Sequence, residues 1–106
     1  MLVYRYEDRN HSGPFAHIGF NRRFAQLPTA QDIGLQWHIG QSASACISID
    51  DLINYFGIAN TQDLETKGYR IAEYDVPNEH VQYGSGQVVF NINQSVLRQF
   101  MDDDDY

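Results

Sequence analysis

The chain has little cysteine, little positive charge and no long apolar run. Its one cysteine, Cys46, cannot form a disulfide within the chain, which predicts a reducing, cytoplasmic environment. No apolar run approaches the length needed to cross a membrane, and residues 1–7 alternate between polar and apolar instead of forming a signal peptide. We therefore expect a soluble cytoplasmic protein with no membrane partner.

Basic residues are scarce in this sequence. Fourteen Asp and Glu stand against seven Lys and Arg, and the net charge at pH 7 is −7. Neutralising phosphates requires Lys and Arg, so this composition argues against direct binding to nucleic acid. The same charge would attract a basic protein surface and accelerate the encounter. Solubility alone could also account for it.

The sequence also lacks a recognised catalytic or metal-binding pattern. Cys46 has no neighbouring base or basic flank that would activate its thiol. Gly84-Ser85-Gly86 lacks the lysine and helix of a phosphate-binding loop. For the same reason we expect no cofactor. We also expect no metal site, because the four histidines are scattered and do not complete a metal-ligand spacing: His11, His17, His38 and His80.

Residues 48–57 carry the clearest structural signal. The Ser48 hydroxyl can accept a hydrogen bond from the first turn of a helix, and Asp51 follows three residues later, as in a capping box. Asp50 and Asp51 occupy the first turn, where the helix dipole favours acids. Gly57 supplies a residue that can end the helix. The apolar positions then form one stripe: Ile49, Leu52, Ile53 and Phe56.

Alternation of apolar residues predicts strands elsewhere in the chain. Further helices are expected where apolar residues recur every three or four positions, one of them capped by Asn93. The order of the expected strands and helices along the chain predicts an α+β domain over residues 1–101, with a small, largely antiparallel sheet and two or three short helices on one side. The expected strands are 2–6, 35–39, 69–76 and 87–92, with a short extended piece at 80–83, and the expected further helices are 21–26, 62–67 and 93–101.

Residues 102–106 form an acidic tail after this domain. Four successive carboxylates could imitate a row of phosphates, although such a tail can also act only as a solubilising segment. If the protein binds a basic partner, we expect the contacts to come from the tail and from acids on exposed turns. These candidates are Asp50, Asp51, Asp63, Glu65, Asp102, Asp103, Asp104 and Asp105.

Four segments together resemble a family of short, mostly uncharacterised bacterial and phage-borne proteins. They are Val-Tyr-Arg-Tyr-Glu at 3–7, Gly-Pro-Phe at 13–15, the helix at 48–56, and Gln-Val-Val-Phe at 87–90. The layout of that family is in turn similar to the ADP-ribosyltransferase fold. That resemblance implies that Arg5 holds NAD, that Cys46-Ile47-Ser48 replaces a Ser-Thr-Ser motif, and that Gln87 occupies the position of a glutamate. An amide cannot act as a carboxylate would, so such an active site would be degraded. The same residues could instead have structural roles, with Arg5 in an ion pair with Glu7 or Asp75 and Gln87 bonded to a neighbouring strand.

Three functions follow from these observations. The first is a small acidic inhibitor of the phage type, similar in profile to anti-CRISPR and other anti-defence proteins. It would bind a basic protein surface in the host cytoplasm and could act as a nucleic-acid mimic without catalysis. The alternative is an ADP-ribosyltransferase-like domain that binds or cleaves NAD through Arg5, Ser48 and Gln87. Self-association through Trp37 and tyrosine-rich strand faces is a third reading.

Overall fold

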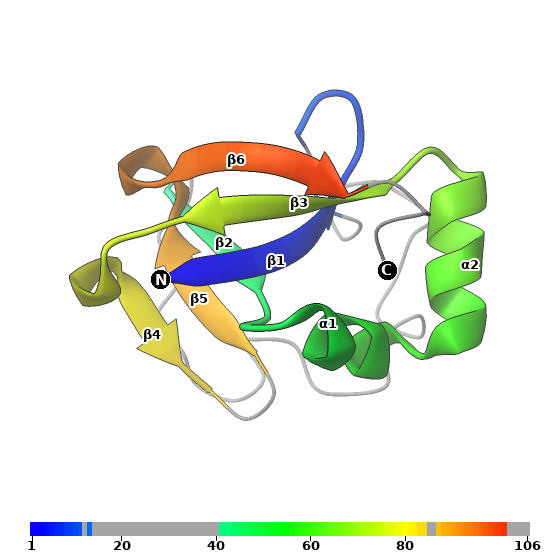
Figure 1. The fold of residues 1–106 in the computed structure, drawn as a ribbon, viewed down its shortest axis with the longest axis horizontal. Coiled ribbons are helices and arrows are strands. Elements are labelled where there is room, and N and C mark those ends of the chain that lie inside the picture. Colours follow the sequence, from blue (N-terminus) through cyan, green and yellow to red (C-terminus); the bar gives the residue numbers. More distant parts are fainter. Residues whose placement is uncertain (12, 14–40, 85–86, 102–106) are drawn as a thin grey trace.

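The structure, a computed structural model, describes residues 1–11, 13, 41–84 and 87–101. These residues form a small α+β fold, as the sequence predicts (Figure 1). Two short 3₁₀ turns, Asn78–His80 and Ile92–Gln94, connect strands. In chain order the helices and strands are β1 (Leu2–Glu7), β2 (Ser42–Ala45), α1 (Ile49–Phe56), α2 (Ile58–Thr66), β3 (Arg70–Asp75), β4 (Val81–Tyr83), β5 (Val88–Asn91) and β6 (Val96–Met101).

The described strands form two antiparallel sheets, where the sequence suggested a single one. One sheet has the order β1-β3-β6 and the other β2-β5-β4. The two sheets meet at an antiparallel bridge between Tyr4 and Cys46, whose backbone N–H groups each donate to the other's carbonyl at 2.8 Å. Figure 1 shows β2 and β5 crossing behind β1 and β3. This bridge joins the end of β2 to the middle of β1.

The two faces of the β1-β3-β6 sheet are buried against different layers. Successive side chains of a strand point to opposite faces, and the alternation predicted for residues 2–6 is confirmed. One face packs against the second sheet, and its core contains Val3, Ala72, Tyr74, Ala43, Val88 and Phe90. The other face packs against α1 and α2, and its core contains Tyr6, Ile71, Leu52, Tyr55, Phe56 and Leu64.

Helix α1 forms as the sequence predicts. The Ser48 hydroxyl accepts a hydrogen bond from the Asp51 backbone N–H at 3.0 Å. Gly57 ends the helix with φ +86°, a conformation that glycine adopts without a side-chain clash. Helix α2 begins at once with Ile58, earlier than the predicted 62–67. Asn60 lies within this helix and donates its side-chain amide to the Phe56 carbonyl at 2.8 Å.

The helix predicted over residues 93–101 is wrong, because residues 96–101 form strand β6. Their apolar positions have helical spacing, but β3 offers an edge to which β6 pairs along its whole length. A register irregularity between Glu73 and Tyr74 lets the unequally spaced apolar residues fit the sheet. Strand β2 was not predicted, and the predictions for 21–26, 35–39 and 102–106 lie outside the described residues.

Candidate functional site

The first turn of α1 presents two adjacent carboxylates. Asp50 is exposed and Asp51 is half-buried. Because the first N–H groups of a helix carry partial positive charge, acids are stable at this position. Neither carboxylate has an ion-pair partner among the described residues, and residues 49–66 contain no Lys or Arg.

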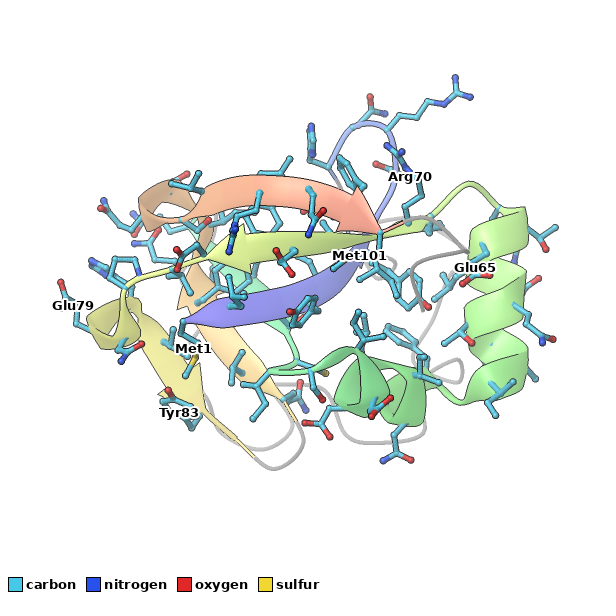
Figure 2. All side chains as sticks on the ribbon, viewed as in Figure 1. Met1, Glu65, Arg70, Glu79, Tyr83 and Met101 are labelled. Atoms are coloured by element: carbon cyan, nitrogen blue, oxygen red, sulfur yellow. The ribbon has the colours of Figure 1, made fainter. Side chains whose placement is uncertain are left out.

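The other acids predicted to bind a partner lie on α2 instead of on exposed turns. Asp63 forms an ion pair with Lys67 at 2.8 Å, and its side chain remains 41% exposed. Glu65 is half-buried, and Figure 2 shows it on α2, at the opposite end of the molecule from Glu79. The four tail residues, Asp102, Asp103, Asp104 and Asp105, lie outside the described residues.

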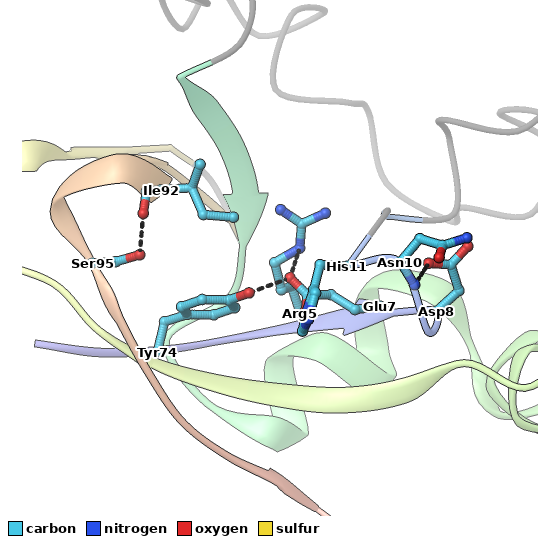
Figure 3. A network of polar contacts seen from close by, with 8 residues as sticks. All are labelled: Arg5, Glu7, Asp8, Asn10, His11, Tyr74, Ile92 and Ser95. Carbon is cyan, nitrogen blue, oxygen red and sulfur yellow. Dashed lines mark hydrogen bonds and ion pairs between the residues drawn. The ribbon is translucent and has the colours of Figure 1, made fainter.

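A second group of charges surrounds Glu7, which ends β1. The Glu7 side chain has no exposed surface. Its Oε2 accepts a hydrogen bond from the Tyr74 hydroxyl at 2.6 Å and lies 3.4 Å from the Arg5 Nε. Its Oε1 lies 3.1 Å from the Nδ1 of His11 (Figure 3). Three side chains therefore share one buried carboxylate.

This environment changes the proton affinity of the groups around Glu7. Burial, together with the hydrogen bond to Glu7, raises the pKa of Tyr74, so its hydroxyl keeps the proton that it donates. Burial lowers the pKa of Arg5, and the charge of Glu7 opposes that effect. The Arg5 Nε is buried and forms no hydrogen bond, so its contact with Glu7 at 3.4 Å is an ion pair only. The guanidinium is thus charged but incompletely satisfied.

His11 connects this cluster to the far edge of the sheet. Its ring stacks on Phe100 of β6, with centroids 5.9 Å apart and an interplanar angle of 26°. The Arg70 guanidinium lies 4.2 Å from the centroid of the same Phe100 ring. His11 has φ +61°, a left-handed conformation that is uncommon outside glycine. Its contacts to Glu7 and Phe100 hold the turn after β1 against the sheet.

A second buried carboxylate, Glu73, lies on the other face of the sheet. Gln99 donates to its Oε1 at 3.3 Å, and the Arg98 Nε lies 3.8 Å away. Burial, followed by a hydrogen bond with Glu73, raises the pKa of Tyr4. The pairing of Arg5 with Glu7 is one that the sequence allowed, whereas Tyr74 and Glu73 were not identified from it. The available signal was an acid inside a strand pattern, which indicates a paired buried charge.

The residues suggested for NAD binding have structural contacts. Arg5 pairs with Glu7, and the Ser48 hydroxyl caps α1. Gln87 is buried directly before β5, near the bridge between the two sheets, because Val88 pairs with Ala45 and Cys46 follows Ala45. Burial, followed by the charge of Asp51, raises the pKa of Cys46 to about 12, so its thiol is inert at neutral pH.

The described residues contain no helix with the length and apolar character needed to cross a membrane, and no group of three or more metal-ligating side chains. Neither a search of curated proteins nor a search of solved structures gave a match. The family model of the Bacteriophage T4 Y00F protein matches residues 1–104. The chain therefore belongs to the Bacteriophage T4 Y00F protein family.

Proposed function

We propose that this member of a phage protein family is a small acidic inhibitor that binds a basic surface of a host protein. The observation that carries the proposal is the pair of adjacent carboxylates in the first turn of α1, which have no ion-pair partner within the described ranges, in a chain of net charge −7. The proposed partner is a nucleic-acid-binding protein of host defence, such as a CRISPR effector. The carboxylates would occupy its phosphate-binding surface.

The ion pairs of the structure support this choice of surface. Asp63 is compensated by Lys67 and Asp75 by the amino terminus, at 2.8 and 3.3 Å. Asp50 and Asp51 have no such partner among the residues described. A cationic partner that approaches the beginning of α1 therefore meets two adjacent carboxylates that no cation of the described residues neutralises.

Mimicry of phosphates predicts a particular dependence on salt. A nucleic-acid-binding surface is rich in Lys and Arg, and an acidic protein that takes the place of the phosphates would make the same salt-sensitive ionic contacts. Exposed charges are screened over about 10 Å at 0.1 M ionic strength. Complex formation should therefore weaken steeply as salt is raised.

Affinity capture from a bacterial lysate tests the proposal. The immobilised protein is loaded at low salt and eluted with a salt gradient, and the eluted proteins are identified. We expect nucleic-acid-binding proteins, eluting at lower salt from the double variant Asp50→Asn/Asp51→Asn than from the parent protein.

The matched control is Asp75→Asn/Glu79→Gln, which changes the net charge by the same amount away from α1. This control should retain its partner almost as well as the parent protein. Equal losses in both double variants would show a response to net charge alone and would exclude α1 as the docking surface. Retention that is insensitive to molar salt would contradict electrostatic mimicry altogether.

A further inference from the structure

We propose that strand β6 pairs with the β6 strand of a second copy of this chain, so that the β1-β3-β6 sheets of two copies join into one. This surface is distinct from the beginning of α1 and does not depend on the function proposed above. The position of β6 in its sheet, the exposure of its side chains and the symmetry of its sequence support this pairing.

Strand β6 lies at one edge of its sheet. In the order β1-β3-β6, its one neighbour among the described strands is β3 (Figure 1). Within the described part of the chain, no backbone hydrogen bond outside that pairing involves residues 96–101. An edge strand presents a row of N–H and C=O groups with which another strand can pair. β6 therefore offers the backbone groups that a further strand requires.

The side chains of β6 are less buried than those of its neighbour β3. Val96 is 66% exposed, and Leu97, Phe100 and Met101 are half-buried, whereas four of the six residues of β3 are buried. The strand contains no proline, and its one charged residue is Arg98. A second strand along this edge would shield apolar surface that the fold leaves in contact with water.

The sequence of β6 is self-complementary when two copies run antiparallel. Residues 96–101, Val-Leu-Arg-Gln-Phe-Met, consist of two apolar, two polar and two apolar residues from either end. An antiparallel pair centred between residues 98 and 99 therefore matches polar with polar at its centre and apolar with apolar on both sides, as a twofold interface requires. The facing pairs are Arg98 with Gln99, Leu97 with Phe100, and Val96 with Met101.

The irregular register of β6 makes these facing pairs compatible with the sheet. Leu97 and Phe100 both pack against the core shared with the second sheet. Arg98 and Gln99 both contact Glu73, on the other face. Directly opposite residues of an antiparallel pair point to the same face, and the members of both pairs do so.

The charge of the chain sets the salt dependence of this association. Each copy has a net charge of −7, so two copies repel each other. Salt screens this repulsion, and β6 itself contains no acid. Dimerisation should therefore strengthen as salt is raised, which is opposite to the salt dependence expected for a basic partner.

Sedimentation equilibrium from micromolar to millimolar protein measures the association. We expect a reversible dimer whose dissociation constant falls as salt is added. Hydrogen exchange over the same concentration range should slow for amides of β6 but not for those of α2. A monomer at every concentration, or a dimer without added protection in β6, would overturn the proposal.

Gln99→Lys tests the centre of the interface. Gln99 is exposed, and lysine retains a donor for Glu73, so the fold should tolerate the change. In the dimer each new lysine would face Arg98 of the other copy. These two like-charge pairs should weaken dimerisation about tenfold.

Val96→Lys and Ile58→Lys form a matched pair at the end of the interface and away from it. The two apolar side chains have similar exposure, 66% on β6 and 69% on α2, and both variants change the net charge equally. Val96→Lys should weaken the dimer because its charge would lie against Met101 of the other copy, whereas Ile58→Lys should dimerise like the parent protein. Equal dissociation constants for these two variants and Gln99→Lys would exclude β6 as the interface.

Discussion

Replacing Glu7 with glutamine should destabilise the fold strongly, although the two side chains have nearly the same size. The Glu7 carboxylate is fully buried, accepts the Tyr74 hydroxyl at 2.6 Å and faces Arg5 at 3.4 Å. Glutamine removes the negative charge and turns one acceptor oxygen into a donor group. The Arg5 guanidinium then stays buried without its counter-charge.

The expected magnitude follows from these contacts. Removing one partner of a buried ion pair costs about 3–5 kcal/mol. Because water reaches part of the Arg5 side chain, which is 13% exposed, we expect the lower end, about 3 kcal/mol. Tyr74→Phe removes one hydrogen bond to a charged group and should cost about 1.5–3 kcal/mol.

Urea denaturation at pH 7, followed by circular dichroism, measures both losses and their coupling. The double variant should lose less than the sum of the single losses, by about 1 kcal/mol or more, because both changes remove the same hydrogen bond. Glu79→Gln is the control, since this exposed acid should change stability by less than about 0.5 kcal/mol. A loss below about 1 kcal/mol for Glu7→Gln, or strict additivity, would refute the argument that Glu7 anchors the cluster.

Two further predictions concern α1. Ser48→Ala should lower the free energy of unfolding by about 1 kcal/mol, because it removes the hydrogen bond from the Asp51 backbone N–H to the Ser48 hydroxyl. Ser48→Asn should retain most of that stabilisation, because asparagine also caps helices. Urea denaturation compares the two variants, and equal losses would contradict a capping role. Burial raises the pKa of the Cys46 thiol from 9.0 to about 12, so between these pH values the folded chain holds a proton that the unfolded chain releases. The contribution of this thiol to the free energy of unfolding is therefore lost as pH rises from about 9 to about 12. Cys46→Ala should flatten this decline in alkaline unfolding curves, and in the parent protein a thiol reagent at pH 8 should react only as fast as the protein opens; immediate labelling would contradict burial.

The sequence was sufficient to predict a helix or strand where the residues that determine it lie close together in the chain. Residues 48–57 contain the cap, the apolar stripe and the terminating glycine, so α1 formed as predicted. Strands β1, β3 and β5 were also predictable because their apolar residues alternate or form short runs. These features depend on neighbours within a few positions of each other in the chain.

Strand β6 depends on a distant partner, which explains the wrong prediction for residues 93–101. Apolar residues at 96, 97, 100 and 101 suit an amphipathic helix, and the same residues suit an edge strand once an irregular register is allowed. Residues 96–101 form a strand instead of a helix because they pair with one edge of β3, which is distant in the sequence. Strand β2 was missed for a related reason, because its Ser-Ala-Ser-Ala sequence has little strand propensity and is held by pairing with β5.

The candidate sites show the same division between local and distant information. The position of Asp50 and Asp51 in the first turn of α1 was predictable from the sequence because the helix itself was predictable. The cluster around Glu7 was not, since it brings together residues 5, 7, 11 and 74 through pairing of β1 with β3. A strand that reads Tyr-Arg-Tyr-Glu does not reveal which of its faces is buried, and here both are.

The buried glutamates also bear on the acidic surface. Arg5 and Arg98 pair with Glu7 and Glu73, acids that have almost no exposed surface. Two of the few cations in the chain are therefore directed to carboxylates that a partner cannot reach, and a third, Lys67, pairs with Asp63. Each of these pairs also takes up one acid, so the excess of seven negative charges in the chain is unchanged. Among the described residues no cation pairs with Asp50 or Asp51, which is why the beginning of α1 is the surface proposed to bind a basic partner.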